Sequence, residues 1–302
     1  MQQVYNPLVQ IVDGGKEMII NVLSGKGGTG KTTVSTNLAY VLKEAGMDVQ
    51  LLDTDVEEPN THIFFDITFE RERSVDILLP VVDKNKCTLC GECAKVCQFG
   101  AIVVFPTTVM VFDYLCHGCG ACTMVCPERA ISERPKSIGK ISFGRTKEGI
   151  KYGMGLLNIG EPSGVRIIRE MKKEMYDAQV TIIDSPPGTS CPVVESLRRS
   201  DFAILVTEST PFGLHDLKMA VRVVREMGIR MGVVINRYDP SFKELEDYLQ
   251  SEGIPLLMRI PFDRRIAHHY SRGEIFSRHI PEWKEEFLRM YEEIEKAAGD
   301  KR

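Results

Sequence analysis

Eight of the nine cysteines in this 302-residue chain fall into two runs with identical internal spacing. Each run reads C-x2-C-x2-C-x3-C, and residues 87–97 recur as residues 116–126 at a shift of 29 positions. Two zinc sites of four thiolates each would not need a third cysteine within each tight run. Disulfide frameworks belong to small secreted domains, whereas this chain is long enough for a large core. The spacing therefore favours iron–sulfur chemistry over zinc or disulfide bonds.

The two runs together resemble bacterial two-cluster ferredoxins, and the second ends in the cysteine–proline pair typical of that pattern. In such ferredoxins the fourth cysteine of each run binds the other cluster. The resemblance implies one [4Fe–4S] cluster held by Cys87, Cys90, Cys93 and Cys126. It implies a second cluster held by Cys97, Cys116, Cys119 and Cys122. The ninth cysteine, Cys191, stands alone, and we expect it to be a small buried hydrophobic residue, with a functional thiol as the weaker alternative.

A second group of residues is suited to binding a nucleotide. The stretch Gly25-Lys26-Gly27-Gly28-Thr29-Gly30-Lys31-Thr32-Thr33 satisfies G-x-x-x-x-G-K-[ST]. Backbone N–H groups of such a loop, with the helix N-terminus behind them, hold phosphates. In this motif the lysine before the threonine contacts the β- and γ-phosphates, and the threonine hydroxyl binds Mg²⁺. Lys31 and Thr32 are therefore the predicted phosphate and magnesium ligands.

Lys26 narrows the type of P-loop, because an ordinary P-loop does not require a lysine at that position. With it, the loop resembles the deviant P-loop of the MinD/ParA and nitrogenase iron-protein superfamily. The resemblance implies a homodimer with ATP at its interface, in which Lys26 reaches the partner's nucleotide. It also implies that Asp53 belongs to the magnesium shell and that Asp55 positions the attacking water. The alternative is that these two acids only cap a turn or a helix.

Other nucleotide contacts are expected where further apolar runs end. Asp184 follows the run 180–183 and precedes a proline–glycine turn, so its carboxylate is expected to hold Mg²⁺ and the Gly188 N–H to contact the γ-phosphate. The resemblance places adenine recognition at Asn236, Arg237, Pro261 and Asp263. Asn236 can pair with the amine and a ring nitrogen of adenine at once. A structural asparagine in a turn is the alternative.

These residues require a scaffold that brings strand ends together. Apolar runs alternate with helical patterns, which is typical of an α/β, doubly wound, mostly parallel sheet with ligands at the carboxyl ends of its strands. The expected strands are 18–23, 49–52, 180–183, 202–206, 232–235 and 256–260, and the expected helices are 31–44, 163–176, 214–227, 241–251 and 282–298. Residues 139–160 are expected to form a hairpin.

The cysteine repeat interrupts this alternation and is therefore expected to be an inserted domain. The predicted organisation is a P-loop ATPase domain in two parts, residues 1–83 and 136–302, with residues 1–16 as an N-terminal extension. Between them, residues 84–135 form a small α+β ferredoxin-like domain that carries both clusters.

Composition excludes several other classes of protein. Hydrophobic residues make up 43% of the chain and the net charge is −4, so no basic field attracts nucleic acid or an anionic membrane. The apolar runs are too short to span a bilayer, and the N-terminus has no signal architecture. We therefore expect a cytoplasmic protein with neither a nucleic-acid nor a membrane partner.

Three functions fit these motifs, and all use Lys26, Lys31, Asp55 and Asp184 to hydrolyse ATP. The first is coupling of a nucleotide-driven dimer rearrangement to electron transfer through the two clusters, toward an unidentified redox partner. The second is an ATPase for iron–sulfur cluster assembly that resembles Mrp-type carriers. Those carriers use a C-x-x-C pair in the C-terminal half, which this sequence lacks. The third and weakest is a positioning ATPase like MinD or ParA.

Overall fold

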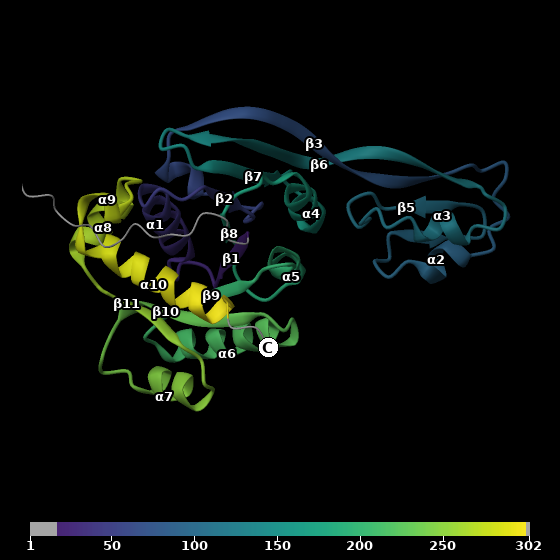
Figure 1. Ribbon diagram of the computed structural model, residues 1–302. Coiled ribbons are helices and arrows are strands. Elements are labelled where there is room, and N and C mark those ends of the chain that lie inside the picture. The colour runs from purple at the N-terminus through teal and green to yellow at the C-terminus, as the bar shows by residue number, and fades with distance from the viewer. Residues whose placement is uncertain (1–16, 300–302) are drawn as a thin grey trace, which may run out of the picture.

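The main lobe is built on a nine-stranded sheet with helices on both faces (Figure 1). The computed structural model describes residues 17–299, so the predicted extension 1–16 lies outside the described residues. The strands of the sheet are β1 (Met18–Leu23), β2 (Val49–Asp53), β3 (Ile67–Val82), β6 (Ile131–Thr146), β7 (Lys151–Leu157), β8 (Val180–Asp184), β9 (Phe202–Glu208), β10 (Arg230–Tyr238) and β11 (Leu256–Pro261). Their order is β11-β10-β9-β1-β8-β2-β7-β6-β3. All neighbours are parallel except the two pairs that contain β6.

The helices of the main lobe confirm the predicted alternation. They are α1 (Lys31–Glu44), α4 (Val165–Glu174), α5 (Cys191–Leu197), α6 (Pro211–Glu226), α7 (Glu244–Ser251), α8 (Arg264–Ser271), α9 (Phe276–His279) and α10 (Glu282–Gly299). Sequence periodicity missed α5, α8 and α9, which have seven, eight and four residues. Seven and four residues are too few for a helical period to emerge, and the eight residues of α8 include few apolar side chains.

The core lies on both faces of the sheet. Helices α1, α9 and α10 pack against one face, and α4, α5, α6 and α7 pack against the other. Because its central strands are covered on both sides, they read as continuous apolar runs rather than as alternating patterns. Within residues 17–299, the structure contains no helix with the length and apolar character that a bilayer crossing needs.

The edge of the sheet extends into a long two-stranded ribbon formed by β3 and β6 (Figure 1). Each strand has 16 residues, and β6 returns through a turn into β7, which confirms the predicted hairpin. Val75 pairs with Gly139 but Asp76 pairs with Ser137, so Ile138 is an extra residue in the ribbon. Such a bulge bends a strand pair. It lies where β6 stops pairing with β7 and the ribbon leaves the sheet.

A second, smaller lobe lies at the far end of the ribbon and contains the cysteine runs (Figure 1). Its elements are the helices α2 (Glu92–Val96) and α3 (Ala121–Val125) and the strands β4 (Ile102–Val104) and β5 (Val109–Val111). The two helices start 29 residues apart, as the sequence repeat requires. We call residues 83–130 the cysteine lobe and the rest of the described chain, apart from the ribbon, the sheet lobe.

Candidate functional site

The glycine-rich loop joins β1 to α1, as the motif requires. Gly28 and Gly30 have φ values of 79° and 99°, a region that glycine adopts without strain. Lys31 starts α1 and is only 7% exposed, whereas Lys26 is exposed on the loop. One lysine therefore points into the site, and the other is available to a second molecule.

The end of β8 supplies a carboxylate to the start of α1. Asp184 accepts hydrogen bonds from the Thr32 hydroxyl at 2.8 Å and from the Ser35 hydroxyl at 3.0 Å. Burial, followed by the nearby Asp53 carboxylate, raises the pKa of Asp184 to about 7. Two buried carboxylates beside a threonine hydroxyl form an oxygen-rich group that fits a hard cation such as Mg²⁺. Ser35 was not predicted, although it lies one helical turn beyond Thr32.

Asp53 and Asp55 lie at the end of β2, but they have different surroundings. The Asp53 Oδ2 atom accepts hydrogen bonds from Asn60 N–H at 2.9 Å and from the Thr61 N–H and hydroxyl at 2.9 and 2.8 Å. Asp53 thereby holds the loop that leads to the short 3₁₀ helix η1 (Thr61–Phe64). Asp55 borders the nucleotide cleft, and its pKa is raised to about 6 by burial and by Asp53.

The Gly188 N–H, predicted to contact phosphate, instead donates to the Ser24 carbonyl at 2.9 Å. The Asn236 amide, predicted to recognise adenine, donates to the Thr29 carbonyl at 2.8 Å and accepts from the Arg237 N–H at 3.0 Å. Both groups are thus hydrogen-bonded to other parts of the protein. A nucleotide must compete for them if they are to play the predicted roles.

A cleft of about 340 Å³ connects these elements at the carboxyl edge of the sheet. The predicted residues that line it are Gly27, Gly28, Gly30, Lys31, Thr32, Thr33, Asp55, Asn236, Arg237, Pro261 and Asp263. Asp263 also caps α8, because its Oδ1 atom accepts the Arg265 N–H at 2.7 Å. Sequence reasoning missed Ile266, Ala267 and Tyr270, which line the same cleft from α8. Their helix gave no periodic signal.

The eight paired cysteines line two separate pockets in the cysteine lobe. The first pocket is bordered by Cys87, Cys90, Cys93 and Cys126. The second is bordered by Cys97, Cys116, Cys119 and Cys122. Each pocket therefore receives three cysteines from one run and the fourth cysteine of the other run. Cys191 lies far along the chain and is exposed, so the expectation that it would be buried was wrong.

The two halves of the lobe repeat their sulfur contacts. The Ala101 N–H donates to the Cys97 sulfur at 3.3 Å, and the Ala130 N–H donates to the Cys126 sulfur at 3.2 Å. The Gly118 N–H donates to Cys116 at 3.5 Å. Backbone N–H groups aimed at sulfur stabilise thiolate charge and tune iron–sulfur clusters. The four-thiolate donor sets and these donors fit [4Fe–4S] clusters.

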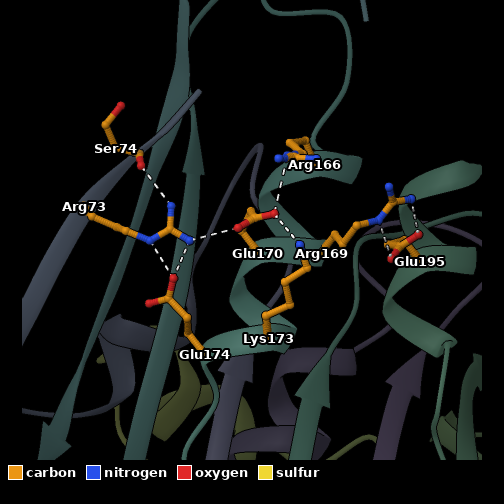
Figure 2. A network of polar contacts seen from close by, with 8 residues as sticks. All are labelled: Arg73, Ser74, Arg166, Arg169, Glu170, Lys173, Glu174 and Glu195. Atoms are coloured by element: carbon orange, nitrogen blue, oxygen red, sulfur yellow. Dashed lines mark hydrogen bonds and ion pairs between the residues drawn. The ribbon is translucent and has the colours of Figure 1, made fainter. Parts of the chain in front are cut away.

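A network of ion pairs joins the turn after Asp184 to the ribbon (Figure 2). Glu195 on α5 accepts two hydrogen bonds from Arg169 on α4, at 3.2 and 3.1 Å. The next residue of α4, Glu170, pairs with Arg73 of β3 at 3.1 Å. Glu174 also accepts from Arg73 Nε, at 2.6 Å. The side chains of Glu170 and Glu195 are only 14% and 9% exposed, so these contacts are better shielded from water than ordinary surface pairs.

Both ends of this network touch regions already described. At one end, the Ser196 hydroxyl of α5 is 2.7 Å from the hydroxyl of Ser185, the residue after Asp184. At the other end, Arg73 lies two residues before the bulge at Val75. A separate contact runs from the residue after Asp55: the Val56 carbonyl accepts the Leu157 N–H of β7 at 2.7 Å. The next N–H, from Asn158, donates at 2.9 Å to the carbonyl of Ile138, the extra residue of the bulge.

Comparisons with known proteins agree with this site. The nucleotide-binding domain shared by CobQ, CobB, MinD and ParA matches residues 20–276. An uncharacterized protein of Methanocaldococcus jannaschii is 34% identical, over 86% of this chain and 91% of its own length. A cytosolic Fe-S cluster assembly factor, the Nubp2 homolog of Anopheles gambiae, is 28% identical, over 87% of this chain and 90% of its own.

A solved structure has the same fold. It is the septum site-determining protein MinD of Pyrococcus horikoshii, complexed with Mg-ADP. Its TM-score is 0.57 at 22% identity, and the alignment covers 94% of this chain and 98% of that chain. The strand–loop–helix that holds Lys31, the carboxylates beside Thr32 and the match over residues 20–276 lead to one conclusion. The chain is a nucleotide-binding ATPase of the CobQ/CobB/MinD/ParA family.

Proposed function

We propose that this protein is an ATP-dependent iron–sulfur protein that acts in cluster assembly, with its nucleotide site controlling the cysteine lobe. The observation that carries the proposal is the pairing of the cysteines. Each pocket has four of them, drawn from both runs, on a lobe whose supporting ribbon is connected to the nucleotide loops through α4 and α5 and through the end of β7. The relatives named as Fe-S cluster assembly factors support assembly over the electron-transfer function that we ranked first from the sequence.

In this proposal residues 84–135 are an inserted ferredoxin-like domain between two parts of the ATPase domain, 1–83 and 136–302. Cys87, Cys90, Cys93 and Cys126 hold one cluster, and Cys97, Cys116, Cys119 and Cys122 hold the other. The clusters supply one-electron chemistry when bound. The chain itself supplies thiolates, the N–H donors of Ala101 and Ala130, and apolar walls that limit water at the sulfurs.

The same proposal assigns roles around the nucleotide. Lys31 binds the β- and γ-phosphates, Thr32 and Asp184 hold Mg²⁺, and Asp55 positions water for hydrolysis. Asp53 supports these residues by ordering the loop through Asn60 and Thr61. Asn236 and Asp263 border the base. The exposed Lys26 serves a homodimer with ATP at its interface, and Lys26→Ala should keep nucleotide affinity while lowering the hydrolysis rate. Unchanged hydrolysis in this variant would argue against the dimer.

Coupling between the sites follows two routes through the ribbon. When the γ-phosphate competes for the Gly188 N–H, the turn from Ser185 moves, and α5 moves with it because Ser185 and Ser196 are bonded. The Glu195–Arg169 and Glu170–Arg73 pairs pass this motion to β3. The second route runs from Asp55 through Val56 to Leu157 beside the bulge. A ligand can shift the lobe only by differing contacts in its two states, and these bonds provide such contacts.

Electron transfer is the second candidate function, and the buried sulfur contacts favour it. Cys93 and Cys116, one cysteine in each pocket, are buried, which limits the access of an acceptor to these two sulfurs. A shielded cluster is more suited to being retained than to being passed on.

One experiment separates the two. Anaerobically prepared, cluster-loaded protein is incubated with an apo-acceptor for a [4Fe–4S] cluster, with ATP, with ADP or with no nucleotide. Cluster assembly predicts iron in the re-isolated acceptor, faster with ATP and independent of ATP in Lys31→Ala. Iron that stays in the protein while ATP changes its rate of reduction by dithionite would favour electron transfer. Absence of iron after anaerobic preparation would refute both functions.

A further inference from the structure

A cluster of metal-ligating side chains outside the nucleotide cleft and the cysteine lobe has no role in the function described above. His269 lies on α8, Glu274 in the turn that follows, and His279 at the end of α9. One ligand atom from each of the three residues lies within 4.8 Å of the others. We propose that these residues form a binding site for a divalent transition-metal ion such as Zn²⁺.

The donor types identify the class of ion. Two imidazole nitrogens and one carboxylate suit zinc and similar transition metals, whereas Mg²⁺ and Ca²⁺ prefer oxygen ligands throughout. The His269 Nδ1 atom is 2.8 Å from Glu274 Oε2, and His279 Nε2 is 3.9 Å from the same oxygen. That oxygen therefore lies between both rings. A set of three protein ligands leaves one position for water, as in open zinc sites.

The surroundings of Glu274 prepare it for this role. Arg272 Nε donates to the other carboxylate oxygen, Oε1, at 2.9 Å, which orients the group and leaves Oε2 facing the histidines. A partner that fixes the outer oxygen of a ligating carboxylate is a regular feature of metal sites.

The backbone beneath the cluster is held in place. The Glu274 N–H donates to the His269 carbonyl at 2.9 Å, which closes the turn between α8 and α9. Next to it, the Ser277 N–H donates to the Asn37 side chain of α1 at 2.9 Å, so α9 is anchored to the core. The His269 and His279 rings are parallel, with centroids 4.5 Å apart. They can turn toward a shared ion because the terminal torsion of histidine is broad.

The position of the site gives metal binding a consequence for the nucleotide. Tyr270, next to His269 on α8, lines the nucleotide cleft and contacts the Phe64 ring of η1 at a centroid distance of 5.3 Å. An ion that joins α8 to α9 would hold this wall of the cleft. We expect zinc to raise ATP affinity only through this wall, without entering the cleft.

The test is zinc titration of the full-length, untagged, cluster-loaded protein by calorimetry. The wild type should bind one zinc ion that His279→Ala and Glu274→Gln lose, with at least about a tenfold drop in affinity. His268→Ala is the matched control, because its ring lies next to His269 on the same helix but is not in the cluster. It should bind zinc as the wild type does.

X-ray absorption at the zinc edge checks where the ion lies. Nitrogen and oxygen ligands without sulfur are expected, and zinc found only with sulfur ligands would place it at the cysteines and overturn the proposal. Equal zinc binding by the wild type and by His269→Ala, His279→Ala and Glu274→Gln would also overturn it. Circular dichroism in the presence of a chelator shows whether each variant folds. Iron content is measured separately, so the absence of zinc binding at this site would not count against the proposed iron–sulfur function.

Discussion

The two lobes of this protein differ in what holds them together. In the sheet lobe, central strands such as β1 and β8 are covered by helices on both faces, and their apolar side chains are almost fully buried. In the cysteine lobe, residues 83–130, the buried residues are only Cys93, Ala101, Ile102, Cys116 and Ala130. Two of these five are themselves proposed ligands. A core of this size cannot stabilise a lobe alone, so we expect the proposed clusters to contribute to its folding.

The difference shows how the two sites depend on their ligands. The phosphate loop is held by the packing of the fold, because the strand before it and the helix after it are largely buried in the core. The two cysteine pockets are formed by thiols in short helices and loops, and in the proposed function their geometry depends on bound clusters. Loss of ATP should therefore leave the nucleotide cleft folded, whereas loss of iron should unfold the cysteine lobe.

Iron removal gives the largest expected effect. Chelation of the clusters should unfold residues 83–130 while the sheet lobe keeps its structure, because most of the buried apolar residues lie outside that segment. Limited proteolysis should then cut within the cysteine lobe, and saturating MgATP should not protect it. Hydrogen exchange would show the same division. A cysteine lobe that resists proteolysis and hydrogen exchange without iron would contradict the inference that iron stabilises this lobe.

Substitution of the buried lysine tests the sheet lobe alone. Lys31→Ala removes the ammonium that faces the phosphates, and we expect nucleotide affinity to fall by roughly 100-fold, which corresponds to about 2.7 kcal/mol. The iron content of the anaerobic protein should not change. Both can be measured on one preparation, by nucleotide titration and by iron analysis. Loss of iron in this variant would mean that the lobes depend on each other for folding.

Cys126→Ser tests how the cysteine pairing divides the two clusters. Cys126 is expected to complete the pocket of the first run, so this variant should lose about half of its iron. Cys191→Ser is the matched control, because Cys191 lies outside both pockets and is exposed. It should keep all its iron, and both variants should bind ATP normally. Iron loss in Cys191→Ser would show that the two proposed sets of four cysteines do not account for all the iron ligands.

The connection between the lobes gives the smallest effect. Arg73→Ala breaks its pairs with Glu170 and Glu174, which should lower the stability of the protein by less than about 1 kcal/mol. ATP affinity and iron content should stay the same, but the effect of ATP on cluster transfer should weaken. Arg225→Ala is the matched control, because Arg225 pairs with Glu252 elsewhere in the sheet lobe. An undiminished ATP effect in Arg73→Ala would exclude this route.

Local chemistry made much of this protein predictable. The strand, loop and helix around Lys31 follow from apolar runs and glycine positions, and the structure confirms the helix at residues 31–44. The expected sheet and its strands were confirmed because buried parallel strands leave a continuous apolar signal. The ribbon was missed, since β3 contains the charged run Glu70-Arg71-Glu72-Arg73, whose exposed side chains hide the strand.

The sequence by itself determined which residues could bind phosphate and which could bind iron, because both depend on residue type and on short spacing. Tertiary structure decided the contacts between distant segments. It placed Asp53 in a loop-holding role, bonded Asn236 to the phosphate loop, and brought Glu195 and Arg73 into one network. It also brought His279 beside His269. Such contacts depend on how strands and helices pack, which spacing along the chain does not encode.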